Sequence, residues 1–140
     1  MSQFGGGSAS YVSPHYHITM KRDMEMIRQI LIDVEAHDSA KPCLQVDDAN
    51  AAYQIALMKE AGLVEAIILE DGQGLPRAAA LLRLTWSGHD FLDSSRDSKI
   101  WKMAVEHIIK PGASWSFSIL SEWLKQEAHR HIFGATTNAG

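Results

Sequence analysis

The sequence predicts a domain of the α+β class, in which a helix, a short strand and a second helix precede a β-hairpin, and further helices follow. Apolar residues recur at helical spacing before and after the hairpin region. Between these stretches, two runs of strand-forming residues flank a turn-rich segment at 70–76. The chain has 140 residues, 46% of them hydrophobic, so it can bury a core without a disulfide or a metal ion. Its single cysteine excludes an internal disulfide.

The two ends of the chain differ in composition from its centre. Residues 1–19 contain no Lys, Arg, Asp or Glu and are rich in glycine and serine, which is typical of a flexible leader or an added segment. Residues 134–140 are small, and we expect a flexible tail there. The charged and periodic part predicts a single domain over 20–133, made of a core and a C-terminal helical extension.

The first half of this domain is expected to hold two helices and three strands. A one-sided apolar stripe predicts the first helix, and Asp23 can cap its start. The second helix should end at Gly62, which readily adopts the left-handed conformation that follows a helix. The predicted elements are a helix over 23–37, a strand over 43–46, a helix over 48–61 and hairpin strands over 63–69 and 78–84.

The second half is expected to be helical. Thr85 can cap a helix that starts at Trp86 and turns Phe91 and Leu92 inward. A polar segment at 93–98 is expected to change the path of the chain. Further helices are predicted over 99–110 and from a cap at Ser114 or Ser116 to about Ile132, with Pro111-Gly112 ending the first of them.

Helix, strand, helix and hairpin follow one another in the order of a winged helix that has one of its usual helices reduced or missing. Residues 53–65 resemble the second helix of a helix-turn-helix running into the wing of bacterial winged-helix regulators, with Ile55, Met58 and Leu63 packed inward. Residues 83–93 resemble the Leu-Thr-x-x-Gly element found after the wing in several such families.

Together with residues 20–24 and 96–102, these two segments resemble DUF2513, a domain-of-unknown-function family of bacteria and their phages or prophages. The resemblance covers about residues 20–133. It implies a winged-helix-like core with extra C-terminal helices, and it implies no catalytic or binding residues.

The first functional hypothesis is a DNA-binding regulator, because such proteins contact base edges with their second helix. Asn50 and Gln54 lie four apart and are expected to face adenine edges from one side of that helix. The net charge of −4 opposes the hypothesis, since residues 20–96 hold 8 Lys and Arg against 13 Asp and Glu, and residues 97–133 hold 5 against 4. The candidate nucleic-acid-binding residues are Lys21, Arg22, Arg28, Asn50, Tyr53, Gln54, Lys59 and Arg77.

The alternative hypothesis is a protein-interaction or dimerisation module without DNA binding. Ala56 and Leu57, if exposed, would form an apolar patch where a DNA-binding helix is polar. Aromatic residues are enriched at the centres of interfaces, although each tryptophan can equally close a small core. The candidate interface residues are Ala56, Leu57, Trp101, Trp115 and Trp123.

No pattern in the sequence predicts catalysis, so we expect a protein that is not an enzyme and takes no cofactor, metal or small-molecule substrate. His89 and Asp90 are chain neighbours and point apart on a helix. His129 and His131 diverge by roughly 200° on a helix and cannot share a metal ion. Cys43 lacks the second cysteine of a zinc pair. No apolar run is long enough to cross a membrane, and we expect a cytoplasmic protein.

Overall fold

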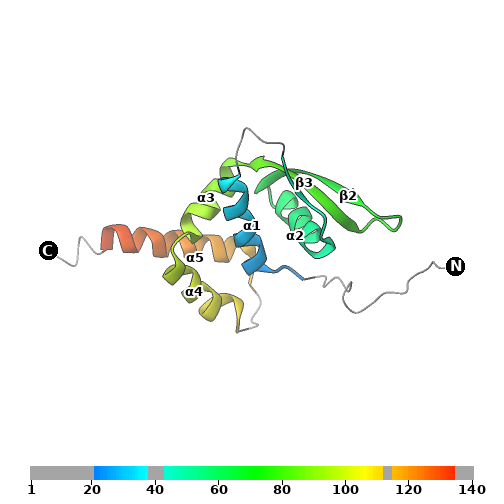
Figure 1. The fold of residues 1–140 in the computed structure, drawn as a ribbon. Coiled ribbons are helices and arrows are strands. Elements are labelled where there is room, and N and C mark those ends of the chain that lie inside the picture. The colour runs from blue at the N-terminus through cyan, green and yellow to red at the C-terminus, as the bar shows by residue number, and fades with distance from the viewer. Residues whose placement is uncertain (1–20, 38–42, 112–114, 135–140) are drawn as a thin grey trace. The chain divides into compact units, whose positions relative to one another are not determined.

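The computed structural model describes residues 21–37, 43–111 and 115–134 (Figure 1). The predicted leader over 1–19 lies outside the described residues, as does nearly all of the predicted tail over 134–140. The chain divides into two compact units, Met1–Leu84 and Thr85–Gly140. The α+β class is confirmed, whereas a single domain over 20–133 stays a prediction.

The first unit contains all five elements expected for it. They are α1 (Met24–Ala36), β1 (Leu44–Val46), α2 (Ala49–Glu60), β2 (Val64–Glu70) and β3 (Pro76–Leu84). The strands form one antiparallel sheet in the order β1-β3-β2. The strand β3 begins earlier than predicted, since proline is tolerated as the first residue of a strand. This order and sheet topology fit the winged-helix-like interpretation.

The core of the first unit lies between the two helices and the inner face of the sheet. Figure 1 shows α2 against the hairpin, and both α1 and α2 contact β3. Ile55, Met58 and Leu63 are buried, as expected from the spacing of apolar residues in α2. Gly62 ends this helix with a φ of +78°, a left-handed conformation that lets the chain enter β2 directly.

The second unit is entirely helical in its described part. It contains α3 (Trp86–Ser95), α4 (Ser98–Ala104), the π-helical turn η2 (Val105–Ile109), α5 (Phe117–His129) and a second π-helical turn η3 (Arg130–Gly134). The helix predicted over 99–110 therefore consists of α4 and η2, and the last predicted helix consists of α5 and η3. Thr85 caps α3 as expected, because its hydroxyl accepts a hydrogen bond of 3.0 Å from the Gly88 N–H.

Both α3 and α4 contact α5, and apolar residues of the three helices form the core of the second unit. Phe91 and Leu92 are buried as expected, and the Phe91 and Phe117 rings lie 4.9 Å apart between centroids. Trp101 is only 4% exposed. The prediction that Trp101 lies at an interface is wrong. Its side chain closes this core, because its spacing places it beside Ala104 on the inner side of α4.

The start of α4 should become less stable in acid, because the Asp97 carboxylate caps it. This carboxylate accepts backbone hydrogen bonds from Ile100 at 3.2 Å and Lys99 at 2.8 Å, which lower its pKa. A lowered pKa in the folded state means that the stabilisation is present above the ordinary aspartate pKa of about 3.9 and is lost as the pH falls through the lowered value.

Urea unfolding of the wild type and of Asp97→Asn checks this expectation between about pH 6 and pH 3. Asparagine also caps helices but does not titrate. The wild type should therefore lose stability relative to the variant as the pH falls. If the free energies of unfolding of the two proteins differed by the same amount at every pH, the titration of Asp97 would not be the cause.

Candidate interaction surface

The outer face of the hairpin is apolar. Burial alternates along β2, so that Val64 and Ala66 face the core while Glu65, Ile67 and Leu69 face outward. Ile67 is 55% exposed and Leu69 is 50% exposed. Leu82 of β3 is also 50% exposed. We call Ile67, Leu69 and Leu82 the hairpin surface.

The strand register explains why these side chains are exposed on the outer face of the sheet. Ile67 is opposite Ala80, and Leu69 is opposite Ala78. Alanine side chains are too short to cover the neighbouring strand. A register shift between Glu65 and Ala66 leaves Leu82 as the extra residue of a bulge. The hairpin surface therefore follows from small residues opposite large ones and from one irregularity in β3.

Charged groups border the hairpin surface at both ends. Next to Leu82, an ion pair joins Arg83 to Glu65 across the two strands, with 2.5 Å between nitrogen and oxygen. At the tip, the Asp71 carboxylate accepts hydrogen bonds from the backbone N–H groups of Leu75 and Gln73. These two bonds lower the pKa of Asp71 and fix the turn. An apolar patch with a polar border is the usual anatomy of a protein-binding surface.

The expectation that Gln54 faces outward to contact DNA is wrong. Its side chain is completely buried, with Oε1 accepting from the Asp23 N–H at 2.8 Å and Nε2 donating to the Lys21 carbonyl at 3.0 Å. Asn50, on the same side of α2, is partly buried, and its Oδ1 is enclosed with no hydrogen-bond partner among the described residues. This side of α2 therefore packs against the start of α1.

The remaining candidates on α2 are divided between partly buried and exposed positions. Tyr53, Ala56 and Leu57 are partly buried, so Ala56 and Leu57 do not form the fully exposed patch that the interaction hypothesis considered. Lys59 is exposed in the last turn of the helix.

The basic candidates outside α2 come from separate elements. Lys21 and Arg22 are exposed before α1, Arg77 is exposed near the hairpin tip, and Arg28 is partly buried on α1. Lys21 is joined to α2 through its backbone carbonyl group, which accepts a hydrogen bond from Gln54 Nε2.

The second unit exposes several large apolar side chains of its own. Trp115 and Trp123, which were expected at an interface, are partly buried. Trp86 is 88% exposed at the first position of α3, and Ile132 and Phe133 are exposed in η3. Trp86 precedes the inward-facing Phe91 and Leu92, so the helical spacing already places it off the buried stripe.

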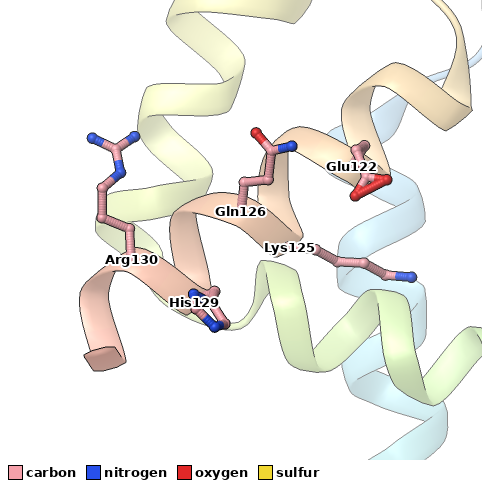
Figure 2. A pocket seen from close by; sticks show the side chains of 5 residues that line it. All are labelled: Glu122, Lys125, Gln126, His129 and Arg130. Atoms are coloured by element: carbon pink, nitrogen blue, oxygen red, sulfur yellow. The ribbon is translucent and has the colours of Figure 1, made fainter. Parts of the chain in front are cut away.

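A shallow, open pocket of about 460 Å³ lies on α5 and the start of η3 (Figure 2). Its cationic side chains are already engaged. The Lys125 Nζ lies 3.0 Å from an Asp90 carboxylate oxygen, which raises the pKa of Lys125, and Arg130 is paired with Glu127. Figure 2 shows Lys125 and Arg130 pointing to opposite sides, so they do not converge on a ligand. The lining residues are Glu122, Lys125, Gln126, His129 and Arg130.

Within the described part of the chain, no three His, Cys, Asp or Glu side chains come together in a way that could hold a metal ion. None of the helices described has the length and apolar character needed to span a membrane.

Comparison with known proteins gives a family and a relative. Residues 21–114 match the family model for hypothetical proteins designated DUF2513. An uncharacterised protein from Haemophilus influenzae is 35% identical over 120 residues, a match that covers 81% of this chain and 96% of that protein. No solved structure matches the chain.

Proposed function

We propose, from the premise that this chain belongs to the DUF2513 family of hypothetical proteins, that it is a protein-interaction module that acts by binding and not by catalysis. The observation that carries the proposal is the hairpin surface, where Ile67, Leu69 and Leu82 are each at least half exposed. Apolar side chains grouped on one face and bordered by charges favour a protein partner.

The same hairpin argues against DNA as the partner. A wing that binds a duplex needs Lys or Arg groups aimed at phosphates. Here the exposed centre of the hairpin is apolar, and Arg83 is paired with Glu65. The tip of the hairpin carries two acidic residues, Glu70 and Asp71, and the basic residue Arg77. With Gln54 buried as well, the protein partner is favoured over the DNA-binding regulator.

Binding energy at this surface would come mainly from apolar burial. Covering a half-exposed isoleucine or leucine contributes about 1 kcal/mol, from the 1.5–3 kcal/mol that complete burial of such a side chain provides. The three residues of the hairpin surface together supply about 3 kcal/mol of the about 8 kcal/mol that a micromolar affinity needs, and neighbouring backbone and rim contacts supply the rest.

Leu69→Asp should weaken partner binding at least about tenfold, because it places a charge within the apolar surface. The tagged chain and the variant are used to capture proteins and nucleic acids from extracts of the native host. A protein captured by the wild type is then purified, and its affinity is measured for both. Ile119→Asp is the matched control, since Ile119 is 55% exposed on α5 of the other unit.

The proposal requires loss of binding in Leu69→Asp and retention in Ile119→Asp, with both variants folded by circular dichroism. Equal affinity of wild type and Leu69→Asp would contradict it. Capture of DNA that is released by moderate salt, with no protein dependent on Leu69, would favour the DNA-binding regulator instead.

A further inference from the structure

The outer strand of the hairpin has a free edge within the described sheet. The sheet order is β1-β3-β2, so β3 is central and β2 pairs with a described strand on one side only. At seven residues, β2 is long enough to offer a continuous row of backbone groups. Such an edge is a template for a further strand, and in β2 it also carries two residues of the hairpin surface, Ile67 and Leu69.

We propose that the protein partner is a second copy of this chain, and that the two β2 strands pair antiparallel about a two-fold axis at Ile67. The pairing would join two three-stranded sheets into one sheet of six strands. This inference rests on the proposed function, because it names the occupant of the hairpin surface. A two-fold interface uses the same patch on both copies, which a single edge strand can provide.

The alternation of β2 restricts the possible registers. Opposite residues in an antiparallel pair lie on the same face of the sheet. With the axis at Ile67, this residue faces its own copy, Glu65 faces Leu69 and Ala66 faces Ile68. Val64 faces Glu70 at the two ends. All seven residues of β2 are then paired, and from Glu65 to Leu69 outward residues meet outward residues and inward residues meet inward ones.

The distribution of carboxylates selects this register over its neighbours. With the axis at Ile67, no carboxylate of one copy is opposite a carboxylate of the other. Moving the axis to Ile68 would place Glu65 opposite Asp71, where like charges destabilise pairing. Moving it to Ala66 would leave only residues 64–68 paired within the strand. The axis at Ile67 thus combines the longest pairing with the absence of repulsion.

The same register gathers the exposed apolar groups. The two Ile67 side chains lie opposite each other, and each is diagonal to Leu69 of the other copy, within reach of long side chains. Four side chains that are at least half exposed in the single chain would cover one another. Backbone hydrogen bonds between the two edges would add affinity, as in other cases of strand addition.

The test is sedimentation equilibrium of the purified chain between about 1 µM and 100 µM, which gives its molar mass and the dissociation constant of a dimer. We expect a dimer, and Ile67→Lys should raise its dissociation constant about a hundredfold, because two lysines would meet at the axis. Ile119→Lys is the matched control: Ile119 is 55% exposed, but it lies on α5 of the other unit and is not part of the hairpin surface. Its dimer should persist.

A charge-reversal experiment separates this geometry from simple loss of folding. Ile67→Lys and Ile67→Glu should each be monomeric alone, and mixing them should restore a dimer that contains one copy of each. A dimer that is unaffected by Ile67→Lys, or a mixture that stays monomeric, would overturn the axis at Ile67.

A wild-type chain that is monomeric throughout the concentration range would overturn the second copy as partner. The proposed function would survive that result if a different protein from the host still bound in a Leu69-dependent way. Absence of both the dimer and such a protein would overturn the two proposals together.

Discussion

Replacing Gln54 with methionine should lower the free energy of unfolding by about 2–4 kcal/mol. Methionine has nearly the same length and fits the buried site, but it can neither accept from the Asp23 N–H nor donate to the Lys21 carbonyl. Each backbone group would lose its partner in a site where the Gln54 side chain is 0% exposed. An unsatisfied buried polar group costs about 1–3 kcal/mol. Both hydrogen bonds are part-buried, so the two losses together lie in the lower part of the range of about 2–6 kcal/mol, which is still a large fraction of the stability of a small protein.

Urea unfolding and thermal melting measure this effect, and the melting temperature should fall by about 10 °C. The control is Gln29→Met on α1, because the Gln29 side chain is exposed and bonds only across the helix surface to Asp33. That change should stay within about 0.5 kcal/mol. Equal stability of Gln54→Met and Gln29→Met would show that the two hydrogen bonds of Gln54 contribute nothing.

This variant also distinguishes a structural role of Gln54 from the predicted role in contacting DNA bases. A residue that contacts bases would affect DNA affinity and leave folding unchanged. A residue that ties the start of α1 to α2 affects folding first. If Gln54→Met weakened duplex binding at unchanged stability, the DNA-binding regulator would again be the better hypothesis.

The element order could be predicted because its signals are local. Asp23, Asp48 and Thr85 each accept a hydrogen bond from a backbone N–H three residues later, so the sequence immediately around a helix start determines the cap. Gly62 ends α2 for an equally local reason, its positive φ. These features need no knowledge of distant parts of the chain.

The inward face of α2 could not be predicted in the same way. Small apolar residues surround this helix on most sides, so the spacing of apolar residues does not select one face. Asn50 and Gln54 do share a side, as expected, but that side meets a segment 31 residues earlier in the chain. Which side is buried depends on this distant contact, which the sequence around Asn50 and Gln54 does not reveal.

The hairpin surface was missed although the sequence held a signal for it. The strand-forming run over 63–69 predicts a strand and, by itself, no exposed apolar face. Since side chains alternate along a strand, Glu65 on the outer face already places Ile67 and Leu69 beside it. The exposure of Leu82 had no such signal, because it depends on the register shift in β3.

Replacing Arg130 with methionine should destabilise the protein by about 1–3 kcal/mol. Its partner Glu127 has a side chain only 4% exposed, although Arg130 itself is 71% exposed. Removing the cation would leave a buried carboxylate without its ion-pair partner. The loss should be smaller than the roughly 3–5 kcal/mol typical of fully buried pairs, because water reaches the guanidinium and screens the charge.

Removing the carboxylate of Glu127 instead should change the free energy of unfolding little. Glu127 is buried on α5 like Leu120 and Leu124, so Glu127→Leu extends the apolar stripe of this helix. We expect its stability within about 1 kcal/mol of the wild type, because replacing a buried ionic group by an apolar one is often neutral or stabilising. The exposed pair of Arg96 and Asp93 has the same spacing, and Arg96→Met should change stability by less than about 1 kcal/mol.

The double variant Glu127→Leu/Arg130→Met decides why the single change at Arg130 is harmful. If the damage comes from an uncompensated buried carboxylate, removing that carboxylate should cancel it, and the double variant should be as stable as Glu127→Leu alone. A coupling of about 1–3 kcal/mol in this cycle is then expected. If the double variant lost as much stability as Arg130→Met, the arginine would act through its own packing and not through the charge of Glu127.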